Sequence, residues 1–144
     1  MNIPHDSVWV ALEAERAFDR AVRARRRDSL AGRILRRCST CARLAIHEVC
    51  RSCTARVRGA TEVPLDAIVG SLEPHRAGDF DSQFRPARGM RSRWLRVWMA
   101  EAAGATLPPI VLAPVADGYA VVDGHHRVSV ARARGAVMIA AIVR

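Results

Sequence analysis

The residues of this chain best suited to chemistry lie in one short run, in which an aspartate and a glycine precede two histidines and an arginine: Asp123, Gly124, His125, His126 and Arg127. An apolar stretch precedes them, so the pattern predicts a buried strand, a tight turn and a helix that begins at the histidines. The free N–H groups and dipole of a helix N-terminus attract anions. Gly124 would let a ligand approach the backbone, and Arg127 would offer its guanidinium to phosphate oxygens. We therefore predict a phosphate-binding turn that Asp123 orients.

A purely structural interpretation of the same run is the alternative. In it Asp123 caps the helix, and His125 and His126 simply complete a strand-to-helix turn. The order of the elements around the turn favours the phosphate-binding interpretation.

The elements that would position this turn follow from the apolar pattern on either side of it. The helix after the turn closes at Gly135, a residue type typical of helix C-termini. Upstream, residues 90–103 predict an amphipathic helix in which Trp94 and Trp98 face the core. Three apolar runs predict strands: residues 107–115, 118–124 and 137–143.

This order of elements resembles the ParB/sulfiredoxin fold over residues 61–144. In that family a strand carrying Pro-Ile, here Pro109 and Ile110, precedes a strand that leads into a turn of the Asp-Gly-His-His-Arg type. A helix ending in glycine and a final strand complete the nucleotide-handling core. The resemblance implies an α+β fold with a small mixed sheet and helices, in which residues 63–69 look like the opening strand. It also implies that segment 73–81 contacts nucleotide, with Arg76 as a second phosphate contact.

The family holds several activities, and the residues of this chain favour some over others. The sulfiredoxin reaction needs a cysteine in the turn, where this chain has His125 and His126, so we expect that activity to be absent. ParB partition proteins carry a DNA-reading helix-turn-helix after this core, whereas this chain ends at Arg144. We therefore do not expect a complete partition protein. No carboxylate cluster with metal-ligand spacing supports nuclease chemistry.

The free-serine kinases of the same fold use a similar turn for phosphates and an upstream acid as the base. Three acidic residues are candidates for that base here: Glu73, Asp79 and Asp81. Catalysis would be nucleoside triphosphate hydrolysis or phosphoryl transfer with magnesium, because the turn supplies positioning and charge neutralisation. The alternative is a non-catalytic, zinc-containing, DNA-associated regulator in which the nucleotide acts as a conformational switch.

All four cysteines of the chain lie in two Cys-x2-Cys pairs separated by eight residues: Cys38, Cys41, Cys50 and Cys53. Four thiolates match one tetrahedral structural zinc site, which has no open position for chemistry. The spacing is short for a zinc ribbon, and neither pair is followed by glycine. A reversible disulfide and an iron–sulfur cluster therefore stay open as alternatives. His47, between the pairs, is expected at the surface.

The positive charge of the chain is concentrated in its first sixty residues. The net charge is +9 and all 23 basic residues are arginines. Residues 1–60 carry 13 arginines against 6 acidic residues. A basic stripe there would bind DNA or another nucleic acid through its phosphates, or would form a solvated helix face. The stripe consists of Arg20, Arg23, Arg25, Arg26, Arg27, Arg33, Arg36 and Arg37.

A helix is predicted over residues 7–27, followed by a second helical piece over 30–37. The first helix has one apolar face, which needs a partner: the C-terminal core, a second copy in a homodimer, or another protein. We expect Trp9, near its start, to anchor that packing.

Two parts are predicted: a basic helix with a zinc module over residues 1–60, and a nucleotide-binding domain over residues 61–144. No apolar run has the length of a membrane span, and the N-terminus lacks the pattern of a signal peptide. We therefore expect a cytoplasmic protein that does not contact membranes.

The cysteine pattern predicts one zinc ion per purified chain, measurable by elemental analysis. Cys38→Ser should remove the zinc and loosen residues 1–60 while sparing residues 61–144. A zinc-free protein with a disulfide between Cys41 and Cys50, or a similar one, under reducing conditions would instead support the redox alternative.

Overall fold

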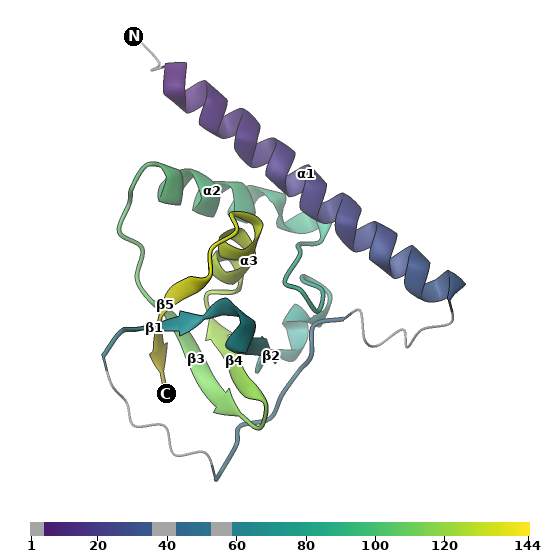
Figure 1. Ribbon diagram of the computed structural model, residues 1–144, viewed down its shortest axis with the longest axis vertical. Coiled ribbons are helices and arrows are strands. Elements are labelled where there is room, and N and C mark those ends of the chain that lie inside the picture. Colours follow the sequence, from purple (N-terminus) through teal and green to yellow (C-terminus); the bar gives the residue numbers. More distant parts are fainter. Residues whose placement is uncertain (1–4, 36–42, 53–58) are drawn as a thin grey trace.

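The computed structural model describes residues 5–35, 43–52 and 59–144, and these form a five-stranded mixed sheet with three α-helices (Figure 1). The predicted mixed sheet with helices is thereby confirmed. The α-helices are α1 (His5–Ile34), α2 (Arg91–Ala102) and α3 (His125–Ala133). The strands are β1 (Thr61–Pro64), β2 (Ile68–Ser71), β3 (Ile110–Val115), β4 (Gly118–Asp123) and β5 (Met138–Val143). Short 3-10 helices are η1 (Leu65–Ala67), η2 (Pro74–Ala77) and η3 (Arg88–Met90).

The order of the strands brings the predicted turn beside the end of β2. The sheet runs β1-β5-β3-β4-β2. β3 and β4 form an antiparallel hairpin, and β5 lies parallel to β3. β2 pairs in parallel with β4, in a register that places Ser71 opposite Val121. Since α3 follows directly after β4, the last residue of β2 and the first residues of α3 lie at the same end of the sheet.

The single opening strand predicted over residues 63–69 is wrong, because this segment contains parts of two strands. β1 pairs with β5 at one edge of the sheet, whereas β2 pairs with β4 at the opposite edge. Between them η1 turns the chain directly after Pro64, which has no N–H to offer a sheet ladder. Apolar residues on both sides of this turn give the sequence the pattern of one strand.

A short segment around Ile46 extends the sheet beyond β2. Ile46 forms a parallel bridge with Ser71. The N–H of His47 donates to the carbonyl of Ser71 at 2.8 Å, and the N–H of Ser71 donates to the carbonyl of Ala45 at 2.9 Å. A Cβ at Gly70 would lie 2.3 Å from that Ala45 oxygen, so the close approach requires glycine. The segment just before Cys50 is thus attached next to β2.

Two apolar clusters join the sheet and the helices, and α3 contributes to both of them. Val128 packs in the cluster that faces the sheet, and Val130 packs in the cluster shared by α1 and α2. In the second cluster Phe18 meets Trp94 edge-on at 5.4 Å between ring centroids, and Trp94 stacks on Trp98 at 5.3 Å. The two tryptophans are 0% and 4% exposed, so their predicted core positions are confirmed.

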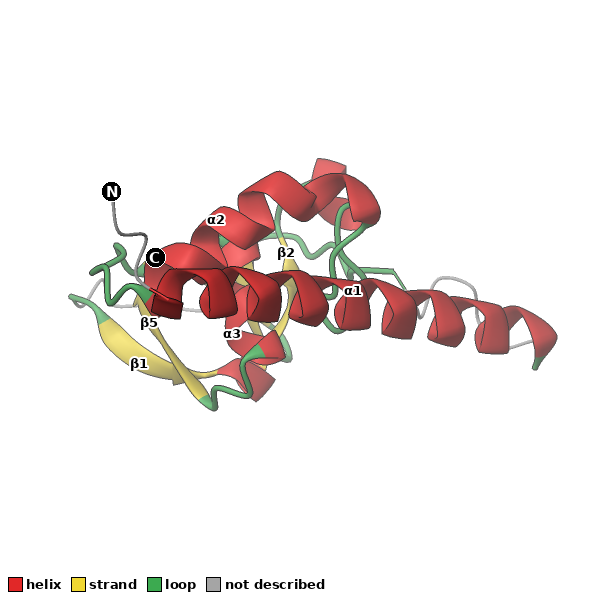
Figure 2. Ribbon diagram, turned by 90° about the horizontal axis from the view of Figure 1, so that it is seen from above, coloured by secondary structure: helices red, strands yellow, loops and turns green. Residues whose placement is uncertain are grey.

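Helix α1 is longer than predicted, and its middle provides the packing. It runs unbroken to Ile34, so the separate piece predicted from Leu30 continues α1 instead. The residues of α1 that are buried are Ala14, Ala17, Phe18 and Val22. Trp9 is 63% exposed, so its predicted anchoring role is wrong. The C-terminal end of α1 extends past α2 and the sheet (Figure 2). In the described part of the chain no helix is long and apolar enough to cross a membrane.

The geometry of the turn before α3 predicts that alanine at Gly124 lowers the unfolding free energy more than alanine at Gly104 does. Gly124 and Gly104 both have positive φ, of 104° and 74°, but a Cβ at Gly124 would lie 2.5 Å from Ile110 Cγ2, whereas Gly104 has open space. Gly104→Ala should cost about 1 kcal/mol of unfolding free energy. Gly124→Ala should cost more than about 2 kcal/mol, because strain and steric conflict add. Urea unfolding measures both, and equal losses would contradict this account of the turn.

Candidate functional site

The turn that begins α3 is held by backbone geometry. Gly124 is the N-cap residue, with φ 104° and ψ 25°, and no side chain caps the helix. The alternative in which Asp123 caps α3 is therefore wrong: Asp123 is exposed and acts on the site through its charge. Close contact between Gly124 and Ile110 presses the turn against β3. His125 and His126 are thereby directed into the protein, where they are 4% and 9% exposed.

His125 is joined to the end of β2 through Ser71. The Nε2 atom of His125 lies 2.7 Å from Ser71 Oγ, and the Ser71 hydroxyl also lies 3.3 Å from the carbonyl oxygen of Val121. The backbone N–H of Glu73 donates to the same hydroxyl at 2.9 Å. Ser71 is fully buried. No local sequence signal marks Ser71, because its role depends on the register between β2 and β4.

His126 is the histidine of the turn whose ring nitrogens make no hydrogen bond within the described residues. The ring packs edge-on against Phe80, with 5.2 Å between centroids. Within the described ranges, Nε and Nη1 of Arg127 and Nε of Arg76 are also buried without a hydrogen-bond partner. Arg76 nevertheless binds Asp79 through Nη1, and the charges of Glu101 and Asp123 act on Arg127. Among the described residues, donors on α3 and on η2 are therefore buried without acceptors from the protein.

The surroundings keep both histidines neutral near pH 7. Burial, reinforced by the positive charge of Arg76, lowers the pKa of His125 from 6.5 to about 4, while Asp123 acts in the opposite direction. Burial, with Arg76 and Arg93, lowers the pKa of His126 to about 4 as well. A neutral imidazole carries one N–H donor and one acceptor nitrogen. The positive charge of the site therefore resides on arginines and on the helix N-terminus.

Two of the three candidate acids are held by arginines. Asp81 is 4% exposed, and its carboxylate accepts the backbone N–H groups of Gln83 at 3.0 Å and Arg85 at 2.8 Å. Its other oxygen binds Arg85 Nε at 2.8 Å. Asp79 binds Arg76 Nη1 at 3.0 Å. Asp81 thus organises its own loop, and Asp79 orients Arg76.

Glu73 is the candidate acid whose backbone is connected to His125 through Ser71. Its carboxylate lies 3.4 Å from Nδ1 of the exposed His75, and its own side chain is half-exposed. Its backbone N–H holds Ser71, which in turn contacts His125. Glu73 therefore combines an accessible carboxylate with a fixed backbone beside the turn.

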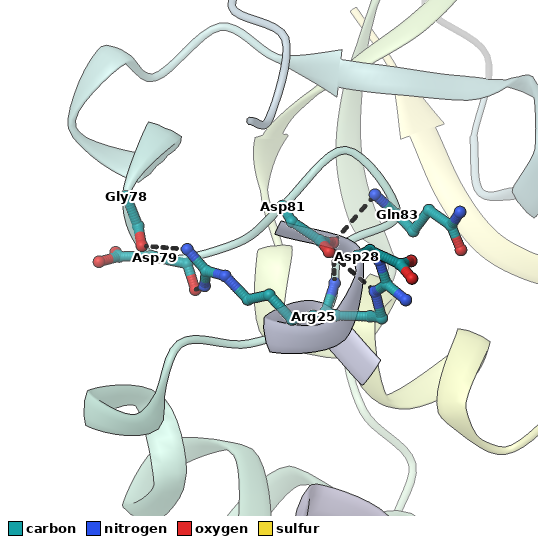
Figure 3. A network of polar contacts seen from close by, with 7 residues as sticks. Arg25, Asp28, Gly78, Asp79, Asp81 and Gln83 are labelled. Atoms are coloured by element: carbon teal, nitrogen blue, oxygen red, sulfur yellow. Dashed lines mark hydrogen bonds and ion pairs between the residues drawn. The ribbon is translucent and has the colours of Figure 1, made fainter. Parts of the chain in front are cut away.

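One arginine of the predicted basic stripe is engaged with the loop that forms this site. Arg25 of α1 donates to the carbonyl oxygens of Gly78 at 3.0 Å and Asp79 at 3.2 Å (Figure 3). Asp28, one turn further along α1, pairs with Arg85 at 2.6 Å. Arg36 and Arg37 lie outside the described residues. The exposed members of the stripe are Arg20, Arg23, Arg26, Arg27 and Arg33.

The predicted zinc ligands fall mostly outside the described residues, which include Cys50 but not Cys38, Cys41 or Cys53. Cys50 is disulfide-bonded. Within the described ranges no group of three or more His, Cys, Asp or Glu residues could hold a metal ion. His47, expected at the surface, is half-buried against Gly70. The zinc site itself stays a prediction.

Comparison of the chain with protein-family models, with curated proteins and with solved structures finds no match. Its function must therefore be inferred from the residues and geometry described above.

The lowered histidine pKa values predict an acid-sensitive fold. Because both fall from 6.5 to about 4 on folding, the unfolded chain binds more protons between these pH values. The unfolding free energy should therefore decrease as the pH falls through this window and be fully present above about pH 6.5. Between pH 7 and 4.5 the wild type should lose about 1–2 kcal/mol more than His126→Leu. Urea titrations at both pH values give this difference, and equal losses would contradict a buried neutral His126.

Proposed function

We propose that this chain is a ParB/sulfiredoxin-like domain that binds the phosphate groups of a nucleotide at the N-terminus of α3. The observation that carries the proposal is the buried His126, whose ring nitrogens have no hydrogen-bond partner among the described residues. The positive charge of Arg76 acts on His126, and Arg127 follows it in the chain, with its charge offset by Glu101 and Asp123. Leaving a buried polar group unpaired costs about 1–3 kcal/mol, so such a cluster favours a ligand that supplies acceptors. Phosphate oxygens are suitable acceptors, since they accept from guanidinium groups and from helix N–H groups together.

The two arginines approach from different elements, which suits a ligand with more than one phosphate. Arg127 lies in the first turn of α3, and Arg76 lies in η2. Gly124, His125 and His126 form the turn that leads to Arg127, and Asp123 is the last residue of β4 before it. Phosphates bridging the two elements would neutralise both guanidinium groups. The resemblance to the ParB/sulfiredoxin family supports a nucleotide, with magnesium, as the source of these phosphates.

The proposed phosphate site could also act as an enzyme that hydrolyses or transfers a nucleotide phosphate. Since Asp81 and Asp79 are held by arginines, Glu73 is the acid best placed to accept a proton. The reaction class would be triphosphate hydrolysis or phosphoryl transfer, in which positioning and charge neutralisation are the main demands.

A second candidate function is a DNA-associated regulator. It is favoured by a cleft of about 300 Å³ between α1 and the start of α2, whose lining carries Arg23, Arg88 and Arg91 against a single acid, Asp19. Arg91 also pairs with Glu15 of α1. Exposed arginines of α1 continue the positive charge along the helix. A nucleic-acid backbone bound there would make the affinity fall steeply with added salt. Arg25 would connect this surface to the loop that carries Arg76, because it holds Gly78 and Asp79.

Arg127→Ala should weaken nucleotide binding by about 1.5–3 kcal/mol, the range for a hydrogen bond to a charged group, without unfolding the domain. His126→Ala should have a smaller effect. Arg96→Ala, on an exposed residue of α2, is the matched control and should bind like the wild type. Calorimetry with ATP, ADP, CTP and GTP in the presence of magnesium measures the affinities.

Equal nucleotide affinity for the wild type and Arg127→Ala, or no binding to either, would refute the phosphate site. Salt-sensitive DNA binding in the same proteins would then support the regulator. Nucleotide turnover without DNA would support the enzyme.

A further inference from the structure

A second concave site lies along the other half of α3, away from the phosphate turn. A cavity of about 460 Å³ separates α1 from the C-terminal half of α3. On the α1 side it is lined by alanines at helical spacing, Ala17, Ala21 and Ala24, and across from them by Ala133 and Ala136. Larger side chains at these positions would fill the space, so the cavity exists because both walls are built from alanine. Its volume lies within the range of small-molecule sites.

The interior end of the cavity is apolar and carries one fixed guanidinium group. Phe84 and Leu65 are nearly fully buried and form part of its lining. Arg132 Nη2 donates to the carbonyls of Leu65 at 2.9 Å and Ile68 at 3.1 Å. The guanidinium carbon lies 5.4 Å from the centroid of the Phe84 ring. Arg132 is thus held in place, yet its Nε has no hydrogen-bond partner among the described residues.

The charges around the cavity favour a ligand with a single negative charge. Arg20 stands at the rim and is exposed, and Arg132 lies inside. Asp66, also in the lining, partly offsets them. Arg85 is occupied by its ion pairs with Asp28 and Asp81. Arg20 and Arg132 together carry two positive charges, and Asp66 carries one negative charge. The net charge of +1 is balanced by a ligand with one negative charge, whereas a phosphate dianion would leave an excess negative charge.

We propose that this cavity binds a small monocarboxylate with an apolar body. The body lies against Phe84 and the alanines of α1 and α3, and the carboxylate accepts from Arg132 and Arg20. The ligand would contact α1, η1, α3 and loop 83–86 together, and so would fasten α1 to the core. This site is independent of the phosphate turn, because its lining contains neither the histidines nor Arg127.

The test uses 2-naphthoate as the probe and the neutral 2-naphthylmethanol as its uncharged counterpart, titrated into the full chain by calorimetry. The carboxylate should bind at least about tenfold more tightly than the alcohol, because a charged hydrogen bond contributes about 1.5–3 kcal/mol. Arg20→Gln should weaken naphthoate binding severalfold. The matched control Arg26→Gln, on an exposed arginine of the same helix outside the cavity, should leave it unchanged.

Filling the cavity tests the location. Ala21→Phe should abolish naphthoate binding, whereas Ala11→Phe, on an exposed alanine of α1, should not. Ala24→Leu serves as the second filling variant if Ala21→Phe does not fold, as judged by circular dichroism. Nucleotide affinity should stay the same in all of these variants. Equal binding of acid and alcohol, no binding of either at millimolar concentration, or unchanged affinity in a folded filling variant would overturn the proposal.

Discussion

The turn at Gly124 is the constraint on which the site depends. Its positive φ and its close approach to Ile110 leave no room for a side chain. The backbone conformation between β4 and α3 is therefore fixed. That conformation places His125 against Ser71 and His126 against Phe80. A different entry into α3 would turn these side chains elsewhere. The buried imidazoles, their lowered pKa values and the partnerless donors beside them all follow from this geometry.

The second support of the site is the loop that follows η2. Asp81 fixes the loop from inside by accepting two backbone N–H groups and pairing with Arg85. Helix α1 holds the loop from outside, because Arg25 binds the carbonyl oxygens of Gly78 and Asp79 (Figure 3). Asp28 of the same helix pairs with Arg85. The loop presents Phe80 to His126, and η2 presents Arg76. The N-terminal helix is therefore linked through this loop to the proposed phosphate site.

The apolar pattern predicts β3, β4, β5 and the helix after Gly124, because strand and helix periodicities are local properties of the chain. The pairing of the strands into a mixed sheet is not local, and the resemblance alone implied it. The same pattern merges β1 and β2, since nothing local shows that strands on either side of Pro64 join opposite sheet edges. The role of Ser71 cannot be predicted from local sequence for the same reason, because its partner His125 is 54 residues away. The roles of Asp81 and Arg25 also depend on tertiary contacts. The cysteine prediction concerns residues mostly beyond those described.

The central claim is that the partnerless groups at the start of α3 receive phosphate. The most direct measurement is the NMR titration of the histidine ring signals with magnesium pyrophosphate. The account predicts that the His126 signals shift and that its pKa rises from about 4, because a bound anion stabilises the imidazolium form. Unchanged His126 signals at saturating pyrophosphate, with shifts confined to the arginines of α1, would contradict it.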